Sequence, residues 1–98
     1  MITELVILDV RPGTEAEFEA AFATARPLIS AAPGFRGLWL ERCLERGSRY
    51  SLRVEWERLE DHTEGFRRSA SYEQWRALLH GFYDPFPTVE HFAGVALD

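Results

Sequence analysis

The sequence of 98 residues predicts a single α+β domain, residues 1–98, with the ferredoxin-like order βαββαβ and an antiparallel four-stranded sheet. Three observations predict this fold. Strand-like and helix-like segments follow one another in that order, a polar turn joins the second and third strands, and the helix-like segments carry apolar stripes. The length is that of one folding unit, so we expect one hydrophobic core.

The first predicted strand covers residues 2–10 and is largely apolar on both faces, which indicates that both faces are covered. Thr14 and Glu17 have the spacing of a capping box and are expected to open a helix. Pro27 lies inside the helix pattern and is expected to kink or split it, because proline has no N–H to donate. The stripe expected to face the core consists of Phe18, Phe22, Ala25 and Ile29.

The second and third predicted strands, residues 35–44 and 49–57, are expected to pair through the polar turn between them. The second strand is apolar on both faces and is expected to place Phe35 on the same face as Trp39. The third strand alternates apolar and polar residues, so one of its faces is expected to be at least partly wet.

Two short helices are expected next, over residues 59–68 and about 72–81, the second opened by a capping box at Ser71. A rigid, proline-containing connection then leads to the last predicted strand, residues 88–97. In that strand His91 belongs to a row of otherwise apolar residues. The chain therefore reads as two βαβ halves joined by a hairpin.

The faces of the predicted sheet are not equally covered. In this architecture the helices cover one face, yet the first, second and last predicted strands are apolar on both faces. A large exposed apolar patch is uncommon on a monomer. The pattern therefore predicts a homodimer in which two copies pack sheet against sheet.

The composition excludes several kinds of chemistry. All 11 basic residues are arginine, so no lysine is present to form a Schiff base or to serve a phosphate-binding loop. Cys43 is the only cysteine, which excludes an internal disulfide and a cysteine-rich metal site and favours a reducing compartment. A net charge of −5 argues against nucleic acid as a partner. Without a long apolar run or a signal-peptide pattern, we expect a cytoplasmic protein with no membrane partner.

The three histidines are the only side chains that titrate near pH 7 without help, and their spacing matches no helical metal pair, so no metal site is expected. His62 lies on the apolar side of its helix, where it is either a general base at a cavity or a partly buried histidine bonded to the backbone. For His91 the sequence supports a structural role and a functional role equally. His80 is expected to end the last helix, where a cation interacts favourably with the helix dipole.

Aromatic residues make up 13% of the chain, which is more than one small core needs. Core packing accounts for each of them singly, but together they predict that one or two line a cavity for a flat aromatic ligand. The candidates are Trp39, Trp56, Phe66, Trp75, Phe82 and Tyr83. Arg67 is the arginine nearest the expected mouth, where it either holds a phenolate or carboxylate or remains a solvated surface residue.

A set of short motifs runs along most of the chain, at residues 32–35, 54–62, 65–69, 75–76 and 87–92. Together these motifs resemble the antibiotic biosynthesis monooxygenase family. The resemblance implies a dimeric α/β barrel made from two ferredoxin-like chains. It also implies that a small aromatic substrate, a polycyclic phenol in characterised members, is oxidised to a quinone by O₂ without flavin, metal or haem, so no cofactor is expected.

The mechanism that this resemblance suggests begins with a base that deprotonates an electron-rich aromatic substrate, whose anion then donates an electron to O₂. His62 is the first candidate for the catalytic base and His91 is the second. The residues that would bind the substrate are Trp56, Phe66, Arg67, Trp75, Phe82 and Tyr83.

The haem-degrading branch of the family uses an asparagine on the first strand, and this chain has no asparagine, so haem degradation is disfavoured. Two other functions stay open. One is a non-catalytic domain that binds a small molecule in the same cavity. The other is an isomerase or cyclase that uses the histidine base without O₂.

Overall fold

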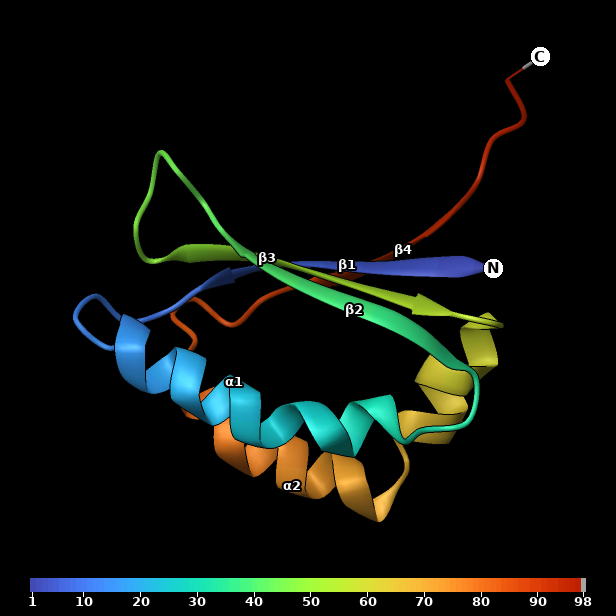
Figure 1. Ribbon diagram of the computed structural model, residues 1–98, viewed down its shortest axis with the longest axis horizontal. Helices are drawn as coiled ribbons and strands as arrows, with labels where there is room; N and C mark the ends of the chain where they lie inside the picture. The colour runs from blue at the N-terminus through green and yellow to red at the C-terminus, as the bar shows by residue number, and fades with distance from the viewer. Residues whose placement is uncertain (98) are drawn as a thin grey trace.

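The structure is a computed structural model that describes residues 1–97. Its elements are β1 (Ile2–Asp9), α1 (Glu15–Ser30), β2 (Phe35–Arg42), β3 (Arg49–Trp56), the π-helix η1 (Asp61–Phe66), α2 (Ala70–Leu79), the 3₁₀-helix η2 (His80–Phe82) and β4 (Val89–Ala93). The strands form one antiparallel sheet in the order β2-β3-β1-β4, and α1 and α2 lie on the same side of it (Figure 1). The predicted ferredoxin-like α+β fold is confirmed.

β1 lies in the interior of the sheet between β3 and β4, and its inward face forms the middle of the core. Val6 and Leu8 on that face are 3% and 1% exposed. Glu4 lies two residues before Val6 and therefore shares the inward face, where it is only 5% exposed. A carboxylate buried among apolar side chains is unfavourable without hydrogen-bond partners. The partners of Glu4 belong to the candidate site described below.

α1 buries the predicted stripe of Phe18, Phe22, Ala25 and Ile29. The expectation that Pro27 could split this helix is wrong, because α1 runs without interruption to Ser30. The missing N–H of Pro27 removes one bond within the last turn, where the helix is about to end. The predicted capping box does not form either, because the hydroxyl of Thr14 donates to the carbonyl oxygen of Arg11 at 2.6 Å.

The predicted capping box at Ser71 is also wrong, because α2 begins two residues earlier in the chain. Ser69 is the residue that caps the helix, and its hydroxyl oxygen accepts a hydrogen bond of 3.1 Å from the backbone N–H of Tyr72. The backbone of Ser69 is extended, as a helix-capping residue requires. Of the two serines, only backbone geometry decides which one acts as the cap.

β2 differs from the expected pattern at its first residues. The register of β2 against β3 shifts between Phe35 and Gly37, which marks a β-bulge. The bulge turns Phe35 to the helix-covered face, where its ring lies 6.0 Å from that of Trp56. Trp39 stays on the opposite face. The prediction that Phe35 and Trp39 share a face is therefore wrong, because the extra residue reverses the alternation.

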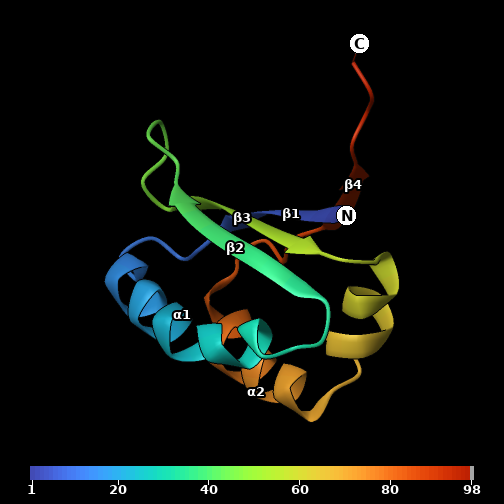
Figure 2. The ribbon, with the colours of Figure 1, turned by 45° about the vertical axis from the view of Figure 1, so that its right-hand side comes forward.

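No helix or strand within residues 1–97 covers the face of the sheet away from α1 and α2 (Figure 2). Three large apolar side chains on it, Ile7, Trp39 and Phe92, are 45%, 40% and 48% exposed. The polar residues that alternate along β3 share this face, and the guanidinium of Arg53 lies 4.2 Å above the ring of Trp39. The chain after β4 leaves the sheet on the same side (Figures 1 and 2). No helix within residues 1–97 is long and apolar enough to cross a membrane.

Candidate active site

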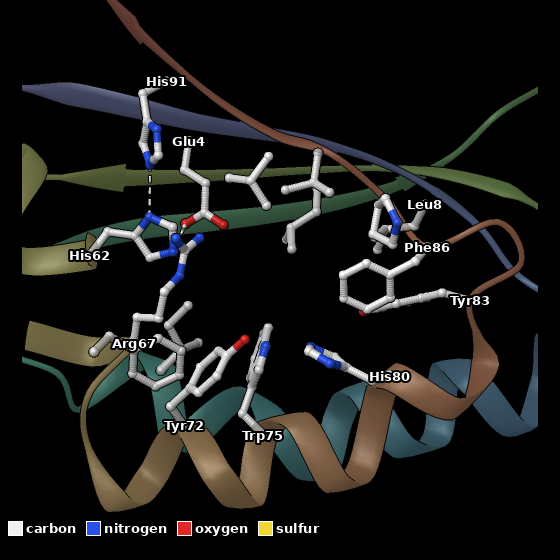
Figure 3. A pocket seen from close by; sticks show the side chains of 16 residues that line it. Glu4, Leu8, His62, Arg67, Tyr72, Trp75, His80, Tyr83, Phe86 and His91 are labelled. Atoms are coloured by element: carbon white, nitrogen blue, oxygen red, sulfur yellow. Dashed lines mark hydrogen bonds and ion pairs between the residues drawn. The ribbon is translucent and has the colours of Figure 1, made fainter. Parts of the chain in front are cut away.

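A cavity of about 430 Å³ lies between the sheet and the helical layer (Figure 3). It is lined by most of the residues that the sequence predicted for the site, namely His62, Phe66, Arg67, Trp75, Tyr83 and His91. Trp56 and Phe82 are not part of the lining. Trp56 is fully buried behind His62, and the ring of Phe82 packs at 5.6 Å against that of Phe18.

The π-helix η1 positions His62. The backbone N–H of Arg67 donates to the carbonyl oxygen of His62 at 3.0 Å, which is the five-residue spacing of a π-helix. Both His62 and Phe66 point inward from this wide turn and are 4% and 2% exposed. The His62 ring stacks on the indole of Trp56 with centroids 5.5 Å apart and planes inclined by 18°. This stacking fixes the plane in which the two ring nitrogens of His62 lie.

The structure brings together the two histidines that the sequence treated as separate candidates. Nδ1 of His62 lies 2.8 Å from Nε2 of His91 on β4 (Figure 3). At this distance one nitrogen donates a hydrogen atom and the other accepts it. The two side chains therefore form one hydrogen-bonded pair in the cavity wall.

Glu4 extends the pair at the other edge of the His62 ring. Its Oε1 lies 3.5 Å from Nε2 of His62 and accepts a hydrogen bond of 2.9 Å from Nε1 of Trp56. Sequence reasoning missed Glu4, although a signal was present. It is the acidic residue in the inward row of β1, whose other members are apolar, and a carboxylate without a partner is unfavourable there.

Burial controls the protonation of this group of side chains. Desolvation raises the pKa of Glu4, while the hydrogen bond from Trp56 and the charge of Arg67 lower it in part. Burial, followed by the charges of Arg67 and His91, lowers the pKa of His62 to about 3. Burial and Arg67 also lower the pKa of His91. Both imidazoles are therefore neutral at pH 7.

Arg67 supplies the positive charge at this end of the cavity. The side chain follows directly after η1, is exposed overall and reaches the cavity wall beside Glu4 and His62 (Figure 3). Within residues 1–97 no carboxylate lies within ion-pair distance of its guanidinium. A ligand that becomes an anion next to the histidine pair would therefore meet a positive charge.

The opposite end of the cavity is aromatic. There the ring of His80 lies 5.1 Å from that of Phe86 and 5.7 Å from that of Tyr83 (Figure 3). Burial raises the pKa of Tyr83 and lowers that of His80, so both side chains are neutral at pH 7. The sequence placed His80 as a cation at a helix end, and it missed Tyr72 and Phe86 as lining residues. No local pattern distinguishes these residues from core or loop residues.

The donor groups of this site do not fit a metal ion. His62 directs Nδ1 to His91 and Nε2 to Glu4, so the three groups do not converge on one point. Within the described part of the chain no three histidine, cysteine or acidic side chains are arranged to hold a metal ion. The arrangement is suited instead to proton transfer at the wall of an aromatic cavity.

Comparisons with known proteins agree with this fold. The family model described as antibiotic biosynthesis monooxygenase matches residues 1–78. The chain is 54% identical over 95 residues to the uncharacterized protein YczJ of Bacillus subtilis (strain 168), covering 97% of this chain and 100% of that protein.

Solved structures give the same result. A putative antibiotic biosynthesis monooxygenase from Bordetella bronchiseptica is 41% identical, with a TM-score of 0.91 and 97% of each chain covered. SnoaB, a cofactor-independent oxygenase from Streptomyces nogalater, is 22% identical with a TM-score of 0.77, covering 99% of this chain and 93% of that one, which shows a shared fold. The chain therefore belongs to the antibiotic biosynthesis monooxygenase family.

Proposed function

We propose that the protein is a cofactor-independent monooxygenase that oxidises a small aromatic phenol with O₂. The observation that carries the proposal is the hydrogen bond between His62 and His91 in the wall of an aromatic cavity. A neutral histidine pair has a free ring-nitrogen lone pair that can take a proton from a substrate bound in the cavity.

The size and lining of the cavity support a flat aromatic substrate. Its volume of about 430 Å³ lies within the range of small-molecule sites. Phe66 and Trp75 on one side and Phe86 at the far end offer ring faces and edges for stacking. The charged and titratable side chains Glu4, His62, Arg67 and His91 are concentrated at the opposite end, so a phenol would bind with its acidic group there (Figure 3).

The reaction balances without a cofactor. The histidine pair removes a proton from the substrate, and the electron-rich anion transfers one electron to O₂. The radical pair combines to a peroxide anion, which takes the proton back from the histidine pair. The resulting hydroperoxide loses water and leaves a carbonyl group. For an anthrone, a CH₂ group and O₂ become C=O and H₂O, so one oxygen atom enters the product and the other enters water. The substrate itself provides all the electrons, and the protein provides the base and the anion-stabilising charge.

We also propose that the active form is a homodimer that pairs the open faces of two sheets. The side chains of Ile7, Trp39 and Phe92 support this proposal, because these large apolar groups are exposed on a face that nothing within residues 1–97 covers. The family resemblance of the sequence points the same way. A second copy covers such a face by two-fold symmetry, with identical residues on both sides of the interface.

Oxygen uptake by metal-free protein tests the activity. With a panel of hydroxylated anthrones and naphthols, we expect O₂ consumption matched by quinone formation, and loss of both in His62→Ala and His91→Ala. Thr63→Ala is the matched control, because the Thr63 hydroxyl bonds only to the carbonyl oxygen of Leu59 among the described residues. Tight binding of the panel without O₂ uptake would favour a binding domain. Conversion of the substrate that continues without O₂ would favour an isomerase or cyclase.

A further inference from the structure

A carboxylate and two imidazoles form a continuous line in the cavity wall. Glu4 and His91 are cross-strand partners in the register of β1 against β4, and both also contact the ring of His62. Nε2 of His62 faces Glu4 and Nδ1 faces His91, so each nitrogen of that ring has a different neighbour. The hydrogen atoms along this line depend on one another, because a neutral imidazole has one N–H and one lone pair.

The hydrogen bond from Trp56 determines that Oε1 of Glu4, at the start of the line, is an acceptor. An indole N–H can only donate, so Oε1 of Glu4, which lies 2.9 Å from Nε1 of Trp56, is an acceptor. The same oxygen faces Nε2 of His62 at 3.5 Å. An acceptor oxygen there favours a hydrogen atom on Nε2 of His62, whether the carboxyl group is ionised or carries its proton on the other oxygen.

The position of this hydrogen atom determines where the other hydrogen atoms of the two histidine rings lie. With Nε2 protonated, Nδ1 of the neutral His62 carries a lone pair and accepts from Nε2 of His91 across 2.8 Å. The neutral His91 then has its lone pair on Nδ1. Within residues 1–97 this nitrogen has no hydrogen-bond partner, and no side-chain nitrogen or oxygen of that part is both buried and without a partner. Nδ1 of His91 is therefore accessible, and His91 lines the cavity.

We propose that Glu4 is a positioning residue that holds the hydrogen atom of His62 on Nε2 and thereby makes Nδ1 of His91 the nitrogen that accepts the substrate proton. This assignment rests on the proposed oxygenase function for its chemical purpose. It exchanges the roles of the two histidines, since His91 becomes the base that contacts the substrate and His62 becomes the residue that orients His91.

The proton transfer balances along the line. Nδ1 of His91 takes the substrate proton, which leaves a substrate anion and an imidazolium. The N–H groups of the line point from His91 through His62 to Glu4, so the new positive charge is stabilised in the direction of the carboxyl group. The imidazolium returns this proton to the peroxide anion, and the proton leaves with the water that is formed when the hydroperoxide breaks down. The charged and titratable side chains next to Glu4 are His62, Arg67 and His91.

Long-range ¹H–¹⁵N NMR of the histidine rings tests the assignment in the free protein. At pH 7 we expect His62 and His91 to carry their hydrogen atoms on Nε2. Glu4→Gln keeps an acceptor oxygen for Trp56 and His62, so it should retain this pattern. Glu4→Met removes the acceptor at similar volume, so the hydrogen atom of His62 should move to Nδ1 and that of His91 should move to Nδ1 as well. Glu90→Gln is the matched control, because this exposed carboxylate is adjacent to His91 in the chain and lies on the open face.

The possible results distinguish a failure of the tautomer assignment from a failure of the proposed oxygenase function. A hydrogen atom on Nδ1 of His62 in the unaltered protein overturns the assignment, even if Glu4→Met does not fold. An unchanged His62 tautomer in folded Glu4→Met also overturns it. If the protein oxidises a phenol, kcat should fall about 100-fold in Glu4→Met, in line with loss of an oriented general base, and recover in Glu4→Gln. The expected tautomers with no O₂ uptake would leave the positioning role of Glu4 intact and reject the proposed oxygenase function.

Discussion

The indole nitrogen of Trp56 donates a hydrogen bond of 2.9 Å to Oε1 of Glu4, and the two residues are 0% and 5% exposed. This bond joins neighbouring strands of the sheet at the place where the cavity carries its acid–base groups. The bond contributes to the stability of the fold, because a buried carboxylate without a donor is unfavourable. It also belongs to the candidate active site, because the same oxygen of Glu4 faces His62.

Trp56→Phe is expected to lower the free energy of unfolding by about 1–3 kcal/mol beyond the effect of the lost ring volume, because Glu4 loses a donor while it stays buried. It should also raise the pKa of Glu4 further, since the bond from Trp56 lowers that pKa. Urea unfolding at pH 7 measures the first effect. Trp75→Phe is the matched control, because the buried indole of Trp75 makes no hydrogen bond within the described residues. Equal losses in the two variants would contradict this role of the Trp56–Glu4 bond.

His62 is expected to make the fold sensitive to mild acid. Its pKa is about 3 in the folded chain against an ordinary value of 6.5, so below pH 6.5 the unfolded chain binds a proton that the folded chain does not. Its contribution to stability is complete above pH 6.5 and is lost as the pH falls toward 3. The raised pKa of Glu4 acts in the opposite sense, because its contribution is present below pH 4.5 and is lost as the pH rises.

The effect of His62 is isolated by the variant His62→Gln. Between pH 7 and pH 5 the unfolding free energy of the unaltered protein should fall by about 2 kcal/mol more than that of His62→Gln, at about 1.4 kcal/mol for each pH unit below 6.5. Urea unfolding series at both pH values give this difference. Parallel pH dependences in the two proteins would show that His62 titrates normally in the fold.

Arg67→Gln is expected to weaken the binding of a phenolate by about 3-fold to 10-fold, a modest effect because the guanidinium is largely exposed to water. It should also raise the pKa values of His62 and His91, because the charge of Arg67 lowers both. Titration calorimetry against pH measures the affinity, and NMR measures the histidine pKa values.

The matched control for this variant is Arg68→Gln. Arg68 is the next residue, is exposed and forms an ion pair of 3.3 Å with Glu64 instead of lining the cavity. If Arg68→Gln weakens phenolate binding as much as Arg67→Gln does, the net charge of the protein and not a contact at the cavity would explain the effect.

A charge on the open face of the sheet is expected to break the proposed homodimer. Phe92→Glu would bury an unpaired carboxylate in the sheet-to-sheet interface, which is strongly unfavourable. Sedimentation at micromolar concentration should give the mass of two chains for the unaltered protein and of one chain for the variant. Leu44→Glu is the control, because Leu44 is 95% exposed in the turn between β2 and β3. A single-chain mass for the unaltered protein would reject the dimer.

The sequence by itself determined the fold class, the order of the elements and the main core stripes. Repeating patterns carry this information, as in α1, where Phe18, Phe22, Ala25 and Ile29 recur at helical spacing and are all buried. It also selected His62, His91 and Arg67 as candidate site residues, because these side chains carry acid–base and anion-binding chemistry.

The sequence pattern did not predict features that depend on the backbone conformation at one or two residues. The bulge beside Gly37 reversed the side of Phe35, and the start of α2 at Ala70 moved the cap from Ser71 to Ser69. Each follows from local geometry that differs little in energy between neighbouring positions. Sequence spacing therefore placed these elements correctly while missing their ends.

The pairing in the candidate site was decided only by the tertiary structure. Glu4, His62 and His91 lie far apart in the chain, and nothing in their local sequence states that they meet. The register of β4 against β1 sets Glu4 opposite His91, and the π-turn of η1 with the stacking on Trp56 places His62 in contact with both. Local periodicity determines which face a side chain takes, whereas contact between distant side chains depends on how sheet and helices pack around one core.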